Sequence, residues 1–231
     1  PKTKISTRID QRINDRILEY KIIRGLLIYN PPKFKSTYIN EAFDFMFKNP
    51  FATVISIVDG KPFVSHLPLT PQKVDDQIEL IGHLARANPH WKILNQSPTT
   101  VIFHGPHTYI TPKWYSKNDV PTWNYIAIHA IGKTELIENY EGLVDVLKTL
   151  TNHVEQHWPS GWDFYIPEDL NEENLSKHIV GFKIKAEEIH FKKKLSQNRT
   201  PEDRAGVLQG LSTRSDDNSR EILFEMQKFE K

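Results

Sequence analysis

The sequence predicts a β-rich α+β fold, a small antiparallel barrel with peripheral helices, built on a core of roughly 150 residues. Three observations carry this prediction. Two β-branched runs are joined by Asp59-Gly60, strand-like segments dominate up to about residue 137, and the apolar period then becomes helical. One β core with helices added to it satisfies all three.

A helix and then a hairpin are the first elements expected after Pro31-Pro32, which interrupts regular secondary structure. Ser36 and Thr37 can cap a helix that ends near Asn49-Pro50. Residues 51–58 and 61–69 then form two strands, because Asp-Gly between β-branched runs favours a type I′ turn.

The middle of the chain is expected to be mostly extended. Further strands are predicted over residues 78–84, 99–104, 108–111 and 123–137, with a break at Gly105-Pro106. The first of these leads directly into a helix, for which Asn88 is the expected N-cap and Pro89 the first helical residue.

The last third is predicted to be largely helical. Apolar residues recur at three and four between residues 140 and 157, which is typical of an amphipathic helix. Then follow a helix over 168–178, a strand over 179–185 that continues near 189–191, and a charged helical tail from 201. We expect three parts: an extension over residues 1–28, a domain over 29–211 and a charged tail over 212–231.

Composition excludes several classes of function. The 231 residues contain no cysteine, which rules out disulfides, thiolate metal sites and a cysteine nucleophile. No P-loop, no Rossmann glycine motif and no Gly-x-Ser-x-Gly elbow is present. No apolar run approaches the roughly 18 residues that span a bilayer, so no membrane contact is expected and a cytoplasmic location is the default.

The net charge of +1 is unevenly distributed. Residues 1–25 hold seven Lys and Arg against three Asp and Glu, a net of +4, which leaves −3 for the remainder. Such a basic segment can touch nucleic acid or acidic lipid, although a solvated surface helix is the favoured interpretation.

Polar residues gather at the predicted strand-to-helix junction: His83, Arg86, Asn88 and Trp91. A helix N-terminus presents unpaired N–H groups, and an arginine adds a bidentate donor, so a phosphomonoester is a natural ligand. The alternative is that Asn88 only caps the helix and Arg86 only faces solvent.

Two later segments also carry candidate binding groups. In Lys194-Leu-Ser196-Gln197-Asn198-Arg199, the amides and hydroxyl suit the pyrimidine edge of a flavin, and the two cations could hold an anion. Thr122, Trp123 and Asn124 open the fifth strand, where the aromatic ring could stack on a ligand or belong to the core.

His153 and His157 lie one helical turn apart, but no third metal ligand can be named nearby, and exposed helical histidines explain the pair equally well.

Taken together, the ordered motifs resemble the PaiB-type family of FMN-binding negative transcriptional regulators, over about residues 29 to 211. The matching segments are Tyr29-Asn-Pro-Pro-Lys-Phe34, His66-Leu-Pro-Leu69, Gly82-His-Leu-Ala-Arg-Ala-Asn-Pro-His-Trp91, Phe103-His-Gly-Pro-His-Thr-Tyr-Ile110, Val120-Pro-Thr-Trp-Asn-Tyr125, Gly181-Phe182 and Lys194-Leu-Ser-Gln-Asn-Arg199.

This resemblance implies the split β-barrel of the pyridoxamine-phosphate-oxidase-like flavoproteins, and a homodimer with FMN near the subunit interface. Carried over by position, it adds Ser65 and His66 to the predicted cofactor-binding residues. The sequence departs from the oxidase relatives at His66 and His83, which stand where arginine or lysine is usual; neutral histidine is a weaker phosphate ligand.

Three functions follow from the resemblance: a flavin-binding regulator, an FMN-dependent oxidoreductase acting on a small molecule, or a haem-binding protein. Fold alone does not choose among them. The sequence contains no convincing helix-turn-helix, so any DNA contact is expected from the basic segment or from the Lys192-Lys193-Lys194 run, and regulation is expected to be indirect or to need a partner.

Overall fold

The computed structural model describes residues 28–75, 77–117 and 119–228. The chain divides into two units, Pro1–Pro31 and Pro32–Lys231, and the structure below is that of the second unit. The predicted extension over residues 1–28 lies almost entirely outside the described residues.

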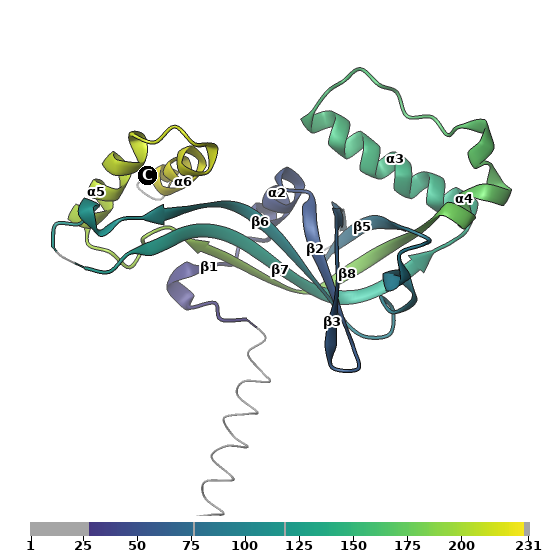
Figure 1. Cartoon of the computed structure of the whole chain (residues 1–231), viewed down its shortest axis with the longest axis horizontal. Helices are drawn as coiled ribbons and strands as arrows, with labels where there is room; N and C mark the ends of the chain where they lie inside the picture. Colours follow the sequence, from purple (N-terminus) through teal and green to yellow (C-terminus); the bar gives the residue numbers. More distant parts are fainter. Residues whose placement is uncertain (1–27, 76, 118, 229–231) are drawn as a thin grey trace, which may run out of the picture. The chain divides into compact units, whose positions relative to one another are not determined.

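The second unit is organised around one antiparallel sheet with the strand order β3-β2-β6-β7-β8-β5-β4, to which β1 adds by pairing with β8 (Figure 1). The strands are β1 (Lys35–Ser36), β2 (Phe51–Val58), β3 (Lys61–Pro68), β4 (Thr70–Val74), β5 (Gln77–Ala85), β6 (Thr99–Ile110), β7 (Thr122–Ile137) and β8 (Ile179–Lys194). The described strands leave the sheet open, with β3 and β4 at its ends. A β-rich split barrel is therefore the observed class.

The α-helices are α2 (Ile39–Lys48), α3 (Tyr140–His157), α4 (Glu172–His178), α5 (Pro201–Ser212) and α6 (Asp217–Lys228). Short 3-10 helices are η1 (Pro32–Phe34), η2 (Pro89–Lys92), η3 (Pro112–Trp114) and η4 (Glu168–Leu170). Within the described residues, no helix is long and apolar enough to cross a membrane.

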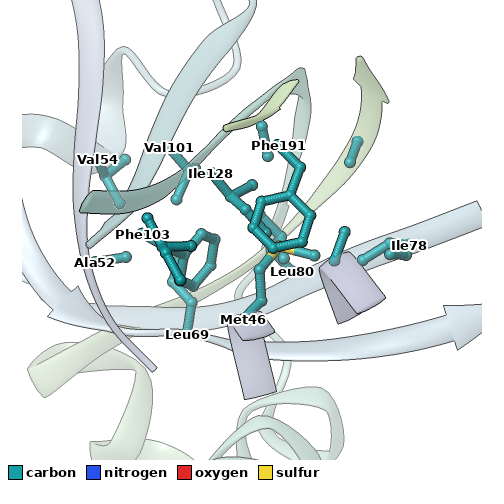
Figure 2. Packing of buried hydrophobic residues seen from close by; sticks show 14 of the residues in the cluster. Met46, Ala52, Val54, Leu69, Ile78, Leu80, Val101, Phe103, Ile128 and Phe191 are labelled. Carbon is teal, nitrogen blue, oxygen red and sulfur yellow. The ribbon is translucent and has the colours of Figure 1, made fainter. Parts of the chain in front are cut away.

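The main core lies on one face of the sheet, which we call the inner face; a smaller cluster of Ile81, Val146 and Leu150 packs α3 against the other face of β5. Figure 2 shows Val54 of β2, Phe103 of β6 and Ile128 of β7 converging with Met46 of α2, and all four are buried. Residues of α5 and α6 belong to the same cluster, so these helices also pack on the inner face. Alternation along each strand turns the intervening side chains to the opposite, outer face.

Over β2 and β3, the outer face is unusually apolar for a surface that none of the described helices covers. Phe51, Ile57 and Val64 are 65%, 56% and 43% exposed on β2 and β3. A sheet with one solvated face normally alternates apolar-in and polar-out. These three residues break that rule.

Several predicted elements are confirmed. Asp59 and Gly60 have φ values of 49° and 73°, as a type I′ turn requires, and join strands paired from Val58↔Lys61 onward. The long fifth strand appears as β7, and α3 covers the predicted residues 140–157.

Other elements differ from the prediction. Gly105-Pro106 does not end a strand: β6 runs through it, with a register shift between His104 and His107 that absorbs the irregular residues. The two predicted pieces after residue 179 form one 16-residue strand, β8. The strand β4 was not predicted; its Pro71 is tolerated because β4 is an edge strand.

Two helices also differ. The predicted helix after Asn88 is only the four-residue 3-10 helix η2, and the predicted helix over 168–178 is a 3-10 turn followed by α4. The C-terminal segment is helical, as predicted, but it is not an exposed tail: Ile222 and Met226 of α6 are fully buried in the main core. Helix α6 is amphipathic, with charged residues on one side and buried residues on the other. The many charged residues of its sequence therefore suggested an exposed segment.

Candidate functional site

The predicted cofactor residues form two clusters near opposite ends of β8. The first surrounds β3, β5 and η2, and its His83 pairs with Gly181 at the start of β8. The second lies where β7 begins and β8 ends, at the pairing of Tyr125 with Lys194. The fourteen residues from Gly181 to Lys194 extend roughly 40 Å along the strand, so His83 and Lys194 lie far apart within one chain.

Three residues of the first cluster bond to one another. The Ser65 hydroxyl lies 2.8 Å from His90 Nδ1, and the Asn88 side-chain amide donates to the same hydroxyl at 3.0 Å. Asn88 Oδ1 also accepts from the His90 N–H at 3.1 Å and caps η2. Because η2 has only four residues, the helix N-terminus expected here as a phosphate site is not formed.

Arg86 holds the first cluster to neighbouring elements. Its guanidinium donates to Glu138 Oε2 at 2.7 Å and to the Ser176 carbonyl at 2.9 Å, and it lies 4.7 Å from the centre of the Trp91 ring. The Trp91 indole N–H donates to the Arg86 carbonyl at 3.0 Å. These contacts already use the guanidinium that was predicted to bind phosphate.

The remaining histidines of the first cluster have unused polar atoms. His66 is exposed on the outer face. Burial lowers the pKa of His83 and of His90, so both are neutral at neutral pH. Among the described residues, the buried Nδ1 of His83 and Nε2 of His90 have no hydrogen-bond partner. Such orphaned atoms fit a polar ligand or an ordered water.

The second cluster is shaped by a tight loop after β8. Ser196 has φ of 62°, and its hydroxyl exchanges hydrogen bonds with the Asn124 side chain at 3.0 and 3.2 Å. The Gln197 side chain accepts from the Leu195 N–H at 2.6 Å and donates back to the Lys193 carbonyl. Asn124, Ser196 and Gln197 therefore fix the loop.

The edge of this loop carries a cationic, an aromatic and an amide side chain. Lys194 donates to the Thr122 hydroxyl, and burial, followed by nearby Lys192 and Arg199, lowers its pKa. Trp123 is 51% exposed beside it. Asn198 is exposed as well.

Arg199 lies in the same loop, but its guanidinium is engaged within the chain. It forms an ion pair with Asp119 and lies 4.2 Å from the centre of the Tyr115 ring.

A group of residues on the outer face was not predicted. The pairings Thr53↔His66, Thr53↔Ile102, Ile102↔His129 and His129↔His190 form one row across five strands. An adjacent row joins His104 to Ala127 and Ala127 to Lys192. The alternation through His129 was visible in the sequence, but only the strand order shows that other histidines share its face.

His153 is a structural residue rather than an exposed one, which corrects the expectation for this helical pair. Its Nε2 donates to the Phe47 carbonyl at 2.7 Å, and its Nδ1 lies 2.8 Å from the Thr70 hydroxyl. The described residues contain no group of three or more His, Asp or Glu that could hold a metal ion.

A cavity of about 220 Å³ lies between α2 and α6, away from both clusters. Its walls include Phe45, Phe191 and Phe224, and Lys193 contributes to its lining. None of the predicted cofactor residues lines it.

Comparison with solved structures supports the fold. The chain superposes on the FAD and haem binding protein of Mycobacterium smegmatis with a TM-score of 0.57 at 18% identity, covering 74% of this chain and 78% of that one. The flavocytochrome Anf3 of Azotobacter vinelandii gives 0.54 at 17% identity, covering 74% and 75%. At these identities the likeness shows a shared fold.

Comparison with other sequences shows the family. The family described as "Putative FMN-binding domain" matches residues 28–188, so the loop with Lys194 and Arg199 lies beyond the matched region. The protease synthase and sporulation protein PAI 2 of Bacillus subtilis is 40% identical over 198 residues, covering 84% of this chain and 94% of that protein. An uncharacterised Aspergillus fumigatus protein is 31% identical over 192 residues, covering 65% and 74%. The chain therefore belongs to this FMN-binding family, the PaiB-type family that its sequence motifs predict, and FMN is the family's cofactor.

Proposed function

We propose that this protein binds FMN between two copies of itself, and that each site combines the first cluster of one copy with the second cluster of the other. The observation that carries the proposal is the separation of His83 in the first cluster from Lys194 in the second, roughly 40 Å along β8. An isologous dimer brings opposite ends of the two chains together and forms two equivalent sites.

The outer face supplies the surface that such a dimer needs. Helices α2, α5 and α6 pack on the inner face, while Phe51, Ile57 and Val64 remain exposed on the outer one. Burying exposed apolar side chains against a second copy removes them from water and stabilises association. The dimer proposal therefore accounts for the missing polar alternation.

The residues available to the cofactor have distinct tasks. Lys194, held by Thr122, would place a positive charge beside the exposed Trp123 ring, which suits an anionic molecule with a planar ring system. From the other copy, His66 and the open Nδ1 of His83 would add hydrogen-bonding groups. When bound, the flavin supplies electron-transfer chemistry, and the protein binds and orients it.

Subunit complementation tests the proposal. Ser65→Ala/His66→Ala disables the first cluster, and Trp123→Ala/Lys194→Ala disables the second. Each double variant alone should form dimers that bind no FMN. Heterodimers of the two, purified through different tags, should bind one FMN per dimer, because one site then contains both intact clusters.

Two results would contradict shared sites: heterodimers that bind no FMN, or a chain that binds FMN as a monomer. Lys177→Ala, on the exposed side of α4, is the matched control and should bind FMN as the unmodified chain does. Equilibrium dialysis gives the stoichiometry, and sedimentation gives the mass of the complex.

A regulatory role is proposed by relation to the Bacillus protein, whose name connects it with protease synthesis and sporulation. With a net charge of +1, we expect regulation to act through a partner or through a small molecule at the flavin site. A gel shift that weakens with salt and survives deletion of residues 1–25 would show direct DNA binding by the remaining chain instead.

Haem is a second candidate ligand, favoured by one observation. His129 and His190 are direct neighbours on β7 and β8, on the uncovered outer face, and imidazole is a common axial ligand of haem iron. An absorption spectrum of the purified protein distinguishes the two cofactors, since flavin and haem absorb in different regions. A Soret band that His129→Gln abolishes would support haem.

A further inference from the structure

Three histidines of the outer face, His104, His129 and His190, are not used by the flavin proposal. His129 lies in the middle of the sheet, with Ile102 of β6 on one side and His190 of β8 on the other. His66 belongs to the same row, and His104 to the next. Histidine is the side chain whose ordinary pKa allows it to change charge between about pH 5 and 8.

Every charged or titratable group near His129 on this face can be assigned to a strand. Strand β6 contributes His104, and β8 contributes Glu188, His190 and Lys192. The β8 register places Lys194 beyond Lys192, and β1 contributes Lys35, which pairs directly with Lys192. Among these described neighbours, Glu188 is the one carboxylate, and it lies 3.0 Å from His190 Nε2.

The face is therefore cationic before any histidine is protonated, and each added proton makes it more so. Burial lowers the pKa of His129, and His104, His190 and Lys192 lower it further. Lys35 and Lys192 are register partners on neighbouring strands, and like charges directly opposite each other are unfavourable. Protonating His129 adds one more positive charge to this face.

In an isologous dimer each group on the interface meets the same surface of the other copy. Pairing two outer faces therefore brings two sets of histidines and lysines close together and removes water from them. Both effects oppose protonation, so the dimer favours neutral histidine more strongly than the single chain does.

We propose that the outer-face histidines make dimerisation, and with it the flavin site, sensitive to acid: the dimer forms when His129 is neutral and separates when it is protonated. The inference rests on the proposed dimer. Proton linkage gives the direction in which dimerisation depends on pH. The separated chains bind more protons than the dimer, so the dissociation constant is lowest above about pH 6.5 and rises as the pH falls below it.

The expected change in the dissociation constant follows from the number of protons bound when the dimer separates. Each copy contributes one His129, so His129 accounts for two protons bound on dissociation and for a rise of at most about a hundred-fold per pH unit. Between pH 7.5 and 5.5, we expect the dissociation constant to rise, by at most about a hundred-fold from His129, and by less than that because burial lowers the pKa of His129.

Sedimentation of the full chain with saturating FMN at pH 7.5, 6.5 and 5.5 tests this. The FMN phosphate has an ionisation of its own near pH 6, so the decisive quantity is the difference from His129→Gln, whose side chain stays neutral. That variant should remain dimeric at pH 5.5. His178→Gln, exposed at the end of α4 and away from the outer face, should separate as the unmodified chain does.

Circular dichroism at each pH separates loss of the dimer from loss of the fold. Should His129→Gln fail to fold, His104→Gln, at an exposed position on the same face, should reduce the pH dependence in part. Equal pH dependence in the unmodified chain and the histidine variants would overturn this inference and leave the dimer proposal standing. A chain that is monomeric with bound FMN at pH 7.5 would overturn both.

Discussion

Lys193 places a charge in the protein interior. Its side chain is 6% exposed and lies 2.5 Å from Glu41 of α2 and 2.9 Å from Glu225 of α6. Burial alone would lower the pKa of Lys193, but hydrogen bonds to the two carboxylates outweigh it and raise the pKa. The ammonium group thereby connects β8 to two helices that are far apart in the sequence.

We expect Lys193→Met to lower the free energy of unfolding by about 2–4 kcal/mol, because two carboxylates would lose the cation between them. The loss should be smaller than for a fully buried pair, since Glu41 is 39% exposed. Urea denaturation followed by tryptophan fluorescence measures it. Adding Glu41→Gln and Glu225→Gln should restore part of the stability; no recovery would mean that packing, rather than charge, explains the loss.

His153 illustrates a buried polar residue whose two nitrogens are both used. His153→Phe should cost about 1–3 kcal/mol, because the Phe47 carbonyl and the Thr70 hydroxyl would lose their partner. Chemical denaturation measures the change. His178→Gln, at an exposed position, should stay within about 0.5 kcal/mol of the unmodified chain. Similar values for the two variants would contradict the structural role of His153.

At the scale of elements, the contact of α5 with η3 depends on two glycines. A Cβ at Gly206 would lie 2.0 Å from the Trp114 carbonyl oxygen, and one at Gly210 would lie 2.1 Å from the Trp114 ring. Helix propensity alone favours alanine over glycine by roughly 0.5–1 kcal/mol. Packing and propensity therefore predict opposite signs for the same substitution.

We expect packing to prevail, so that Gly206→Ala and Gly210→Ala each lower stability although they favour the helix. Thermal unfolding followed by circular dichroism gives the sign. Gln209→Ala, exposed on the same helix, is the matched control and should be neutral or slightly stabilising. A higher melting temperature for both glycine variants would show that α5 is not held against Trp114.

At the scale of the whole molecule, buried histidines predict an acid-sensitive fold. The pKa values of His83, His90, His129 and His153 are all lowered, with burial as the first cause in each case. The folded state therefore binds fewer protons than the unfolded state once the pH falls below about 6.5. The contribution of these four histidines to the free energy of unfolding is fully present above that pH. It is lost as the pH falls through their lowered pKa values.

The melting temperature should accordingly be lower at pH 5.5 than at pH 7.5, and nearly constant between pH 7.5 and 8.5. His153→Phe should reduce the difference between pH 5.5 and 7.5, because it removes one of the four groups. Differential scanning calorimetry is the appropriate measurement. A melting temperature that does not fall on acidification would contradict the prediction.

Much of the fold could be predicted because local patterns agreed with it. The Asp59-Gly60 turn, the alternation of β7 and the helical period of α3 each depend on nearby residues alone. The incorrect predictions concern elements whose conformation depends on contacts with distant parts of the chain. A bulge between His104 and His107 keeps β6 continuous, and β4 is a strand because β5 pairs with it.

The candidate site was predicted by residue but not by arrangement. The motifs identified Lys194 and the residues around Asn88 and indicated the family. They did not indicate that Asn88, Gln197 and Ser196 make hydrogen bonds within the chain, or that Arg86 donates to Glu138. Those contacts join residues from elements that only the folded sheet brings together.

By itself, the sequence determined the β-rich class, the hairpin, the main helices and the FMN-binding family, because turn chemistry, periodicity and ordered motifs are local properties of the chain. Only the tertiary structure decided which residues meet. The order of the strands places four histidines on one face of the sheet, and the length of β8 separates His83 from Lys194 in the predicted flavin site. Strand order and register depend on contacts between distant segments, which no local pattern specifies.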